Sequence, residues 1–228
     1  PYKPKRRTRA QIAREAGLEP LADAILADLA CDPTTLAAGF LNPTADINDA
    51  KSALDGARDI LAERYAENAD LLAHMRDHLW ARGFLYSKVA EGKQDEGANF
   101  RDWFDFNEPL RTLPSHRVLA LLRGRQQGVL DIRIGLDPES DILVPHPCIV
   151  RIAHFLGLGD GPFALAPAPR DKWLADVCRW TWRVKLLTMF ESEMISRLRD
   201  SAQDEAIRVF AANLKDLLLA APAGPKAV

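Results

Sequence analysis

The stretch DKWLADVCRWTWRVKLLTMFESEMISRLRDSAQDEAIRVFAANLKDLLLAA, residues 171–221, decides the fold of this chain. Neither proline nor glycine interrupts it, and apolar side chains recur along it at helical spacing. An unbroken helix of about 50 residues would be roughly 75 Å long, which exceeds the diameter of a compact domain. We therefore predict one long central helix, or a bent pair of helices, over residues 168–221.

The tryptophans of this stretch indicate how the helix packs. Trp173 and Trp180 share an apolar stripe with Val177 and Val184, and large aromatic side chains at this spacing are usually buried. Trp182 lies nearly opposite Trp180 and needs a packing partner of its own. We expect neighbours on more than one side of the helix.

Helical signals also fill the chain before residue 83. Asp32 followed by Pro33 is typical of a helix N-cap with proline in the first turn, and Gly17 and Gly83 are suitable residues just past a helix end. The expected helices cover 8–17, 19–29, a short segment after 33, and a long segment over 46–82 that breaks or bends around 66–69.

One segment departs clearly from helical periodicity. Leu130, Ile132, Ile134 and Leu136 alternate with polar or small residues, which is typical of a half-buried strand. A strand this short needs a partner, in this chain or outside it. Residues 86–99 are polar and are expected to form an exposed loop or a turn of helix.

An aromatic group follows that loop. Phe100, Trp103, Phe104 and Phe106 could offer stacking platforms for bases. At helical spacing beside Leu110 they are more often core residues, and we interpret them as core.

The sequence thus predicts a mainly α fold, a multi-helix domain with a long central helix and at most a short β element near 129–136. Three segments are expected. Residues 1–45 hold a basic arm and N-terminal helices, 46–160 a helical body with the short strand, and 168–221 the long helix.

Composition places the chain among ordinary globular proteins. Its 228 residues have a formal net charge of −2, and no apolar run approaches the roughly 20 residues that span a bilayer. Cys31, Cys148 and Cys178 are far apart and form no paired motif, which favours buried or inert thiols in a reducing compartment. We expect a soluble, cytoplasmic monomer with no membrane contact.

The two ends favour an interior segment of a longer protein. The chain opens on Pro1 instead of methionine and closes on a linker-like APAGPKAV. Function is therefore expected to depend also on residues beyond this sequence.

Catalytic signatures are absent from the sequence. It contains no phosphate-cradling glycine loop and no nucleophile elbow. His74 and His78 have the spacing of zinc ligands, but the glutamate of a zinc peptidase and a third ligand are missing. We interpret them as surface histidines and expect no enzyme activity, no metal and no cofactor.

Two basic clusters are the candidate contacts for nucleic acid, since arginine forks suit phosphates. The first is an arm, whose alternative is a solvated flank packed on acidic surface. The second lies near a helix that we expect Ser115 to cap and Gly124 or Gly128 to end. The alternative, which we slightly favour, is that the arginines of this cluster pair with the acidic residues of 102–108. The candidates are Lys3, Lys5, Arg6, Arg7 and Arg9 in the arm, and Arg117, Arg123 and Arg125 in the second cluster.

Several stretches of the chain together carry a family resemblance. They are PYKPKRRT (1–8), AQIAREAGLEPLA (10–22), GANFRD (97–102), PSHR (114–117), RGR (123–125), GVL (128–130), RWTWRVK (179–185) and EAIRVF (205–210). In order and over essentially the whole chain, they resemble the Tex family of bacterial transcription accessory proteins. Asn99 and Trp103 stand where the family pattern suggests lysine and tyrosine, and 137–169 resembles it least.

The resemblance implies a place in a longer architecture. Tex-like proteins have a helix-turn-helix-like region, this helical segment with its long helix, an RNase H-like domain, helix–hairpin–helix motifs and an OB-fold domain that carries most nucleic-acid binding. The leading hypothesis is a non-catalytic scaffold that holds flanking domains and adds basic contacts to RNA or DNA. The alternative is a protein-interaction module that docks onto the transcription machinery.

Overall fold

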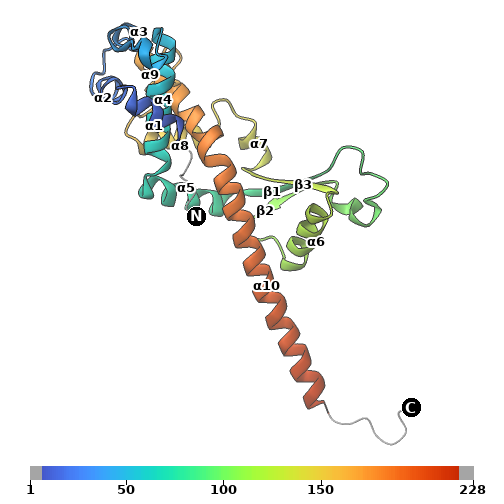
Figure 1. Ribbon diagram of the computed structural model, residues 1–228. Helices are drawn as coiled ribbons and strands as arrows, with labels where there is room; N and C mark the ends of the chain where they lie inside the picture. Colours follow the sequence, from blue (N-terminus) through green and yellow to red (C-terminus); the bar gives the residue numbers. More distant parts are fainter. Residues whose placement is uncertain (1–6, 221–228) are drawn as a thin grey trace, which may run out of the picture. The chain divides into compact units, whose positions relative to one another are not determined.

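The computed structural model describes residues 7–220 and divides them into two compact units (Figure 1). The first unit comprises residues 7–78 and 138–190, and the second comprises 79–137 and 191–220. Each is described by itself. The three segments expected from the sequence remain a prediction about organisation.

The first unit is helical. Its caps follow the sequence signals: Thr8 and Gln11 form a reciprocal capping box at the first helix, and Asp32 caps the third. Gly17 follows the first helix with a positive φ of 85°. The α-helices are α1 (Arg9–Glu15), α2 (Glu19–Ala27), α3 (Pro33–Ala37), α4 (Ala50–Ala66), α5 (Ala69–Arg82, which continues into the second unit), α7 (Pro138–Asp141), α8 (Pro147–Phe155) and α9 (Pro169–Trp180).

Helix α4 forms the core of this unit, because α1, α2, α3 and α9 all contact it. Ala53 and Ala57 are fully buried on it, and small side chains let neighbouring helices approach closely. At Gly56 an added Cβ would lie 2.3 Å from the Leu18 side chain. The break predicted around 66–69 is confirmed between α4 and α5.

Helix α9 buries a different face from the one predicted. Leu174, Val177 and Cys178 are fully buried, whereas Trp173 and Trp180 are only half-buried. The burial predicted for Trp173 and Trp180 is therefore wrong, although Val177 of the same predicted stripe is buried. The guanidinium of Arg58 instead covers the ring of Trp180 and lies 3.9 Å from the ring centroid.

A π-helical segment, Thr181–Leu186, follows α9 and leads into α10 (Leu187–Leu219). The Thr181 hydroxyl donates to the carbonyl of Val177 at 2.8 Å, a side-chain bond that perturbs helices at such points. Trp182 is buried and stacks on His146 with ring centroids 5.8 Å apart. His146 is therefore the separate packing partner that Trp182 was expected to need. The long helical element predicted over this stretch is also confirmed.

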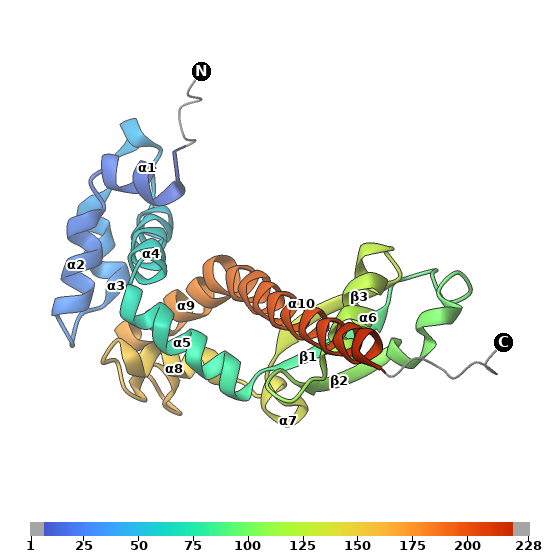
Figure 2. The same ribbon diagram turned by 90° about the horizontal axis from the view of Figure 1, so that it is seen from below.

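The second unit contains a three-stranded antiparallel sheet in the order β2–β1–β3 (Figure 2). Leu85 pairs with Glu108 on one side and Ile134 on the other. The predicted strand is confirmed as β3, and its partner lies in this chain. The strands are β1 (Phe84–Val89), β2 (Asp105–Pro109) and β3 (Leu130–Gly135).

Strand β1 corrects the loop expected over 86–99. Leu85 and Ser87 are buried while Tyr86 and Lys88 lie on the other face. The alternation of this strand is hard to recognise in the sequence because a serine occupies a buried position. Its hydroxyl donates to the carbonyl of Trp103 at 2.8 Å, which satisfies the buried polar group.

The aromatic group lies partly in a 3₁₀ helix, Ala98–Trp103, and partly in β2. Phe100 is buried, as predicted, but Trp103 and Phe106 are half-buried and meet edge to face at 4.9 Å. The helical spacing assumed for this group is therefore wrong. Phe106 lies in a strand.

Helix α6 (Ser115–Gln126) packs on β3. Gly128, with φ of 70°, follows its end as predicted. The expected capping role of Ser115 is wrong: Pro114 is the N-cap, and the Ser115 hydroxyl donates to the carboxylate of Glu205 on α10. A distant acceptor on α10 holds this side chain.

Within the second unit, α10 has a buried beginning and an exposed end. Met194, Ile195, Leu198 and Ala202 are buried, whereas every residue from 203 to 220 is exposed. Across the described ranges, no helix combines the length and apolar character needed to cross a membrane.

Candidate nucleic-acid interface

The basic arm is only partly described. Lys3, Lys5 and Arg6 lie outside residues 7–220. Arg7 forms an exposed ion pair with Glu15 at 2.9 Å, and Arg9 is exposed in the first turn of α1. Binding of nucleic acid by the arm therefore stays a prediction.

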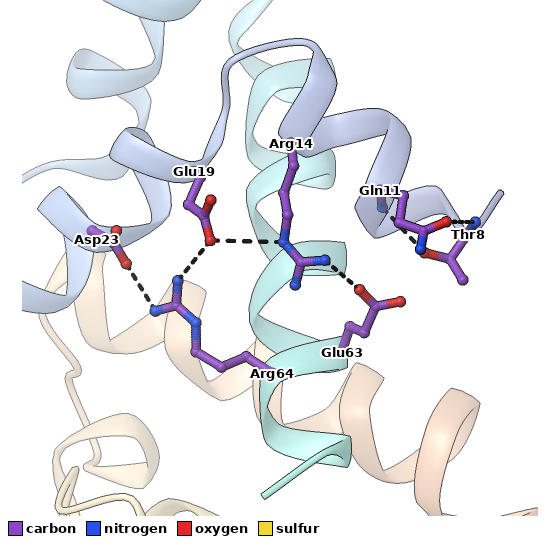
Figure 3. Close-up of polar contacts among 7 residues, drawn as sticks. All are labelled: Thr8, Gln11, Arg14, Glu19, Asp23, Glu63 and Arg64. Carbon is purple, nitrogen blue, oxygen red and sulfur yellow. Dashed lines mark hydrogen bonds and ion pairs between the residues drawn. The ribbon is translucent and has the colours of Figure 1, made fainter.

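Arg14, the last cation of the N-terminal run, belongs to the fold. Its guanidinium donates to Glu63 of α4 at 2.6 Å and lies 3.7 Å from Glu19 of α2. Arg64 continues the network with ion pairs to Glu19 at 3.3 Å and Asp23 at 2.8 Å. Figure 3 shows these side chains converging from α1, α2 and α4. The network joins three helices.

Glu63 is the buried member of this network, with 8% of its surface exposed. Burial alone would raise the pKa of the Glu63 carboxyl, but hydrogen bonds from Thr8 and Arg14 and the charge of Arg14 outweigh burial. The pKa of Glu63 therefore lies below its ordinary value. Its ionised form contributes to the stability of the first unit.

The second predicted cluster divides into two kinds of arginine. Arg117 forms an ion pair with Glu108 of β2, and both side chains are partly buried. This is the structural alternative foreseen for the cluster. Arg123 and Arg125, in contrast, are exposed in the last turn of α6.

Arg123 and Arg125 line an open groove between α6 and α10, within the second unit. The groove has a volume of about 810 Å³, and a third cation, Arg199, enters it from α10. No acidic residue of the described chain lines it. Its lining comprises Leu119, Leu122, Arg123, Arg125, Gln126, Ser192, Ile195, Arg199 and Gln203.

Sequence reasoning missed Arg199 because no local motif distinguishes it. Ile195, Arg199 and Gln203 share one face of α10 by their spacing of four residues. That pattern shows only that they lie on one helical stripe. The approach of α6 depends on the fold.

Another face of α10 carries acidic residues. Glu193, Asp200, Asp204 and Glu205 line a separate hollow of about 740 Å³, together with Arg197 and Arg208. Positive and negative charges on this helix are thus partly sorted by face. The α6–α10 groove lies on the positive side.

The histidine pair lies in a hollow of the first unit. His74 and His78 line it with His154 and Arg151. An Arg151 Nη lies 3.0 Å from His74 Nε2, and His154 Nε2 lies 2.7 Å from Asp160. No group of three or more His, Cys, Asp or Glu in residues 7–220 is arranged to hold a metal ion. The histidines have other partners.

The three cysteines are reduced and buried. Burial raises the pKa of both the Cys148 and the Cys178 thiol to about 12. Such thiols are unreactive at neutral pH, so the prediction of buried thiols is confirmed.

Comparison with known sequences places these features in context. Residues 28–210 match a family model described as Tex central region-like. The chain is 77% identical over its full length to protein Tex of Bordetella pertussis, and 49% identical over 98% of its length to the transcriptional accessory protein Tex of Neisseria gonorrhoeae. It is 26% identical over 97% of its length to the human S1 RNA-binding domain-containing protein 1. It spans 29%, 28% and 22% of these relatives, respectively.

Proposed function

Because this chain belongs to the Tex family, we propose that it is the helical scaffold segment of a transcription-associated protein that binds RNA or DNA. In this role it is non-catalytic, cytoplasmic and monomeric, and it holds flanking domains of the longer protein. The observation that carries the proposal is the exposed apolar face at the end of α10.

This face is continuous. Ile207, Phe210, Leu214 and Leu217 fall within an arc of roughly 80° when about 3.6 residues make a turn. Ile207 and Phe210 are each 67% exposed, and Leu217 is 75% exposed. Contiguous exposed apolar side chains on this scale mark surfaces that bind another protein surface.

The length of the relatives supports an occupant from the same longer chain. Each of the three relatives described is more than three times as long as the segment it shares with this chain. Residues Met194 to Ala202 of α10 bury side chains in the second unit, whereas the apolar face from Ile207 onward is exposed. A helix of this kind suits the attachment of further domains.

Substitution on this face of a full-length Tex-family protein tests the scaffold. The variant Ile207→Gln/Phe210→Gln/Leu214→Gln should separate thermal unfolding into more than one transition and speed proteolytic cleavage within α10. The same variant of the 228-residue chain should keep its unfolding midpoint, because these side chains are already exposed there.

A matched control replaces three exposed polar residues of the same helix, as Asp204→Asn, Arg208→Gln and Lys215→Gln. We expect this variant to behave like the unmodified protein in both lengths. Equal behaviour of the apolar variant and the unmodified full-length protein would contradict the scaffold.

The alternative function, docking onto the transcription machinery, is favoured by a second apolar surface. Ile142, Leu143 and Val144 are 78%, 53% and 93% exposed in the first unit, and Leu143 lines the hollow that contains His74. Binding of purified RNA polymerase to the chain, lost on Leu143→Ser/Val144→Ser, would support this role. Binding that survives both substitutions would argue against this surface.

A further inference from the structure

We propose that the groove between α6 and α10 binds the sugar–phosphate backbone of a nucleic acid and does not read its bases. The inference rests on the proposed association with nucleic acid and assigns one place for it. Arg123 and Arg125 come from α6, and Arg199 comes from α10.

The charge of the groove is uncompensated. The three arginines are exposed, and within residues 7–220 none of their guanidinium groups forms an ion pair or a hydrogen bond. The four acids of the separate hollow, Glu193 among them, do not line this groove. Three cations facing one hollow repel one another, and a polyanion relieves that repulsion.

Helix electrostatics account for only part of this arrangement. Arg123 and Arg125 lie in the last turn of α6, where cations are favoured by the helix dipole. Arg199 lies well inside α10, between Leu187 and Leu219, where that effect has vanished. The convergence of Arg199 on the other two therefore points to a shared ligand.

The other lining residues select a backbone over a base. Gln126 and Gln203 can supply neutral hydrogen-bond donors beside the guanidinium groups, as is common for phosphate and sugar contacts. Leu119 and Leu122 offer an apolar floor. The groove contains no aromatic ring among its described lining residues, so it lacks the platform on which bases stack. Binding should be independent of sequence.

The test measures binding of the 228-residue chain to labelled oligonucleotides of about 20 nucleotides by fluorescence anisotropy, from about 50 to 200 mM salt. The probes are single-stranded RNA, the same sequence as single-stranded DNA, and the duplex DNA. Arg123→Gln/Arg125→Gln/Arg199→Gln should raise Kd by tenfold or more at the lowest salt, and should reduce the salt slope by about 2 for single strands.

The matched control removes three other exposed arginines of the second unit, as Arg101→Gln/Arg111→Gln/Arg208→Gln. A separate variant, Arg7→Gln/Arg9→Gln, measures the contribution of the arm. We expect at most a threefold change in Kd from the arginine control. Circular dichroism and thermal unfolding of each variant separate a binding defect from misfolding.

The outcomes distinguish this site from the wider function. Binding that is salt-sensitive but equally weakened by the groove variant and the arginine control would overturn the groove while retaining nucleic-acid contacts elsewhere. Absence of binding by the unmodified chain would also overturn the groove, but would leave the α10 scaffold standing. A poly-glutamate peptide serves as an additional probe. If the groove variant lost binding to this peptide while its oligonucleotide binding stayed unchanged, the ligand of the groove would be an acidic protein instead.

Discussion

Arg170 and Arg14 of the first unit and Arg123 and Arg199 of the second unit have opposite surroundings. In the first unit Arg170 is 6% exposed and donates to the carbonyls of Ile25 and Leu26 at 2.8 and 2.9 Å, and Arg14 is held by Glu63. In the second unit Arg123 and Arg199 face an open groove. A cation is therefore structural where the fold supplies acceptors, and it remains available to a ligand where the fold supplies none.

The largest effect that would test this comparison is expected at Arg170. Arg170→Ala should lower the free energy of unfolding by about 3 kcal/mol, because it leaves buried carbonyls at the end of α2 without donors. Urea denaturation followed by circular dichroism measures the change. Arg179→Ala is the control, since Arg179 forms an exposed pair with Asp176, and its loss should cost less than about 1 kcal/mol. Equal losses of stability in the two variants would contradict the distinction between structural and available arginines.

Substitution of Gly124 tests whether α6, which carries two of the groove arginines, is packed rigidly against β3. It is buried in α6 between Arg123 and Arg125, and an added Cβ would lie 2.5 Å from the Leu130 side chain and 3.0 Å from that of Phe100. Helix propensity alone would make alanine stabilising. We expect Gly124→Ala to destabilise the chain by about 1–3 kcal/mol through overpacking, measured by chemical denaturation. A gain in stability would show that α6 can move away from β3.

Glu63 predicts how the stability of the first unit depends on pH. Its folded pKa lies below the unfolded value, so the unfolded state binds more protons as pH falls through about 4, and stability is lost there. Above the unfolded pKa the contribution is complete. Since Arg14 is partly exposed, we expect only about 1–2 kcal/mol. Glu63→Gln should be less stable at pH 7 and lose less between pH 7 and about 3 in the same assay. An unchanged pH profile would contradict this.

The smallest effect is expected from the groove arginines. Arg123→Gln or Arg199→Gln should change the free energy of unfolding by less than about 0.5 kcal/mol, because neither side chain is paired among the described residues and both are exposed. Thermal unfolding at matched salt measures the change. A loss above about 1 kcal/mol would place these arginines with Arg170 as structural residues.

Local chemistry made several elements predictable from sequence. The Asp32-Pro33 signal marks the start of α3, Gly128 follows α6, and the alternation after Leu130 identifies β3. These features depend on neighbours within a few residues. The absence of proline and glycine likewise indicated the helical run ending in α10, because helix formation is limited mainly by such breakers.

The helical character, the long helical element and the positions of the basic residues along the chain follow from the sequence alone. Only the tertiary structure decided which residues those cations meet: Arg14 meets Glu63, Arg117 meets Glu108, and Arg199 joins Arg123 across a groove. It also decided that Ser87 lies in a central strand. The physical reason is that periodicity orients side chains within one element, whereas pairing and burial depend on elements brought together from distant parts of the chain.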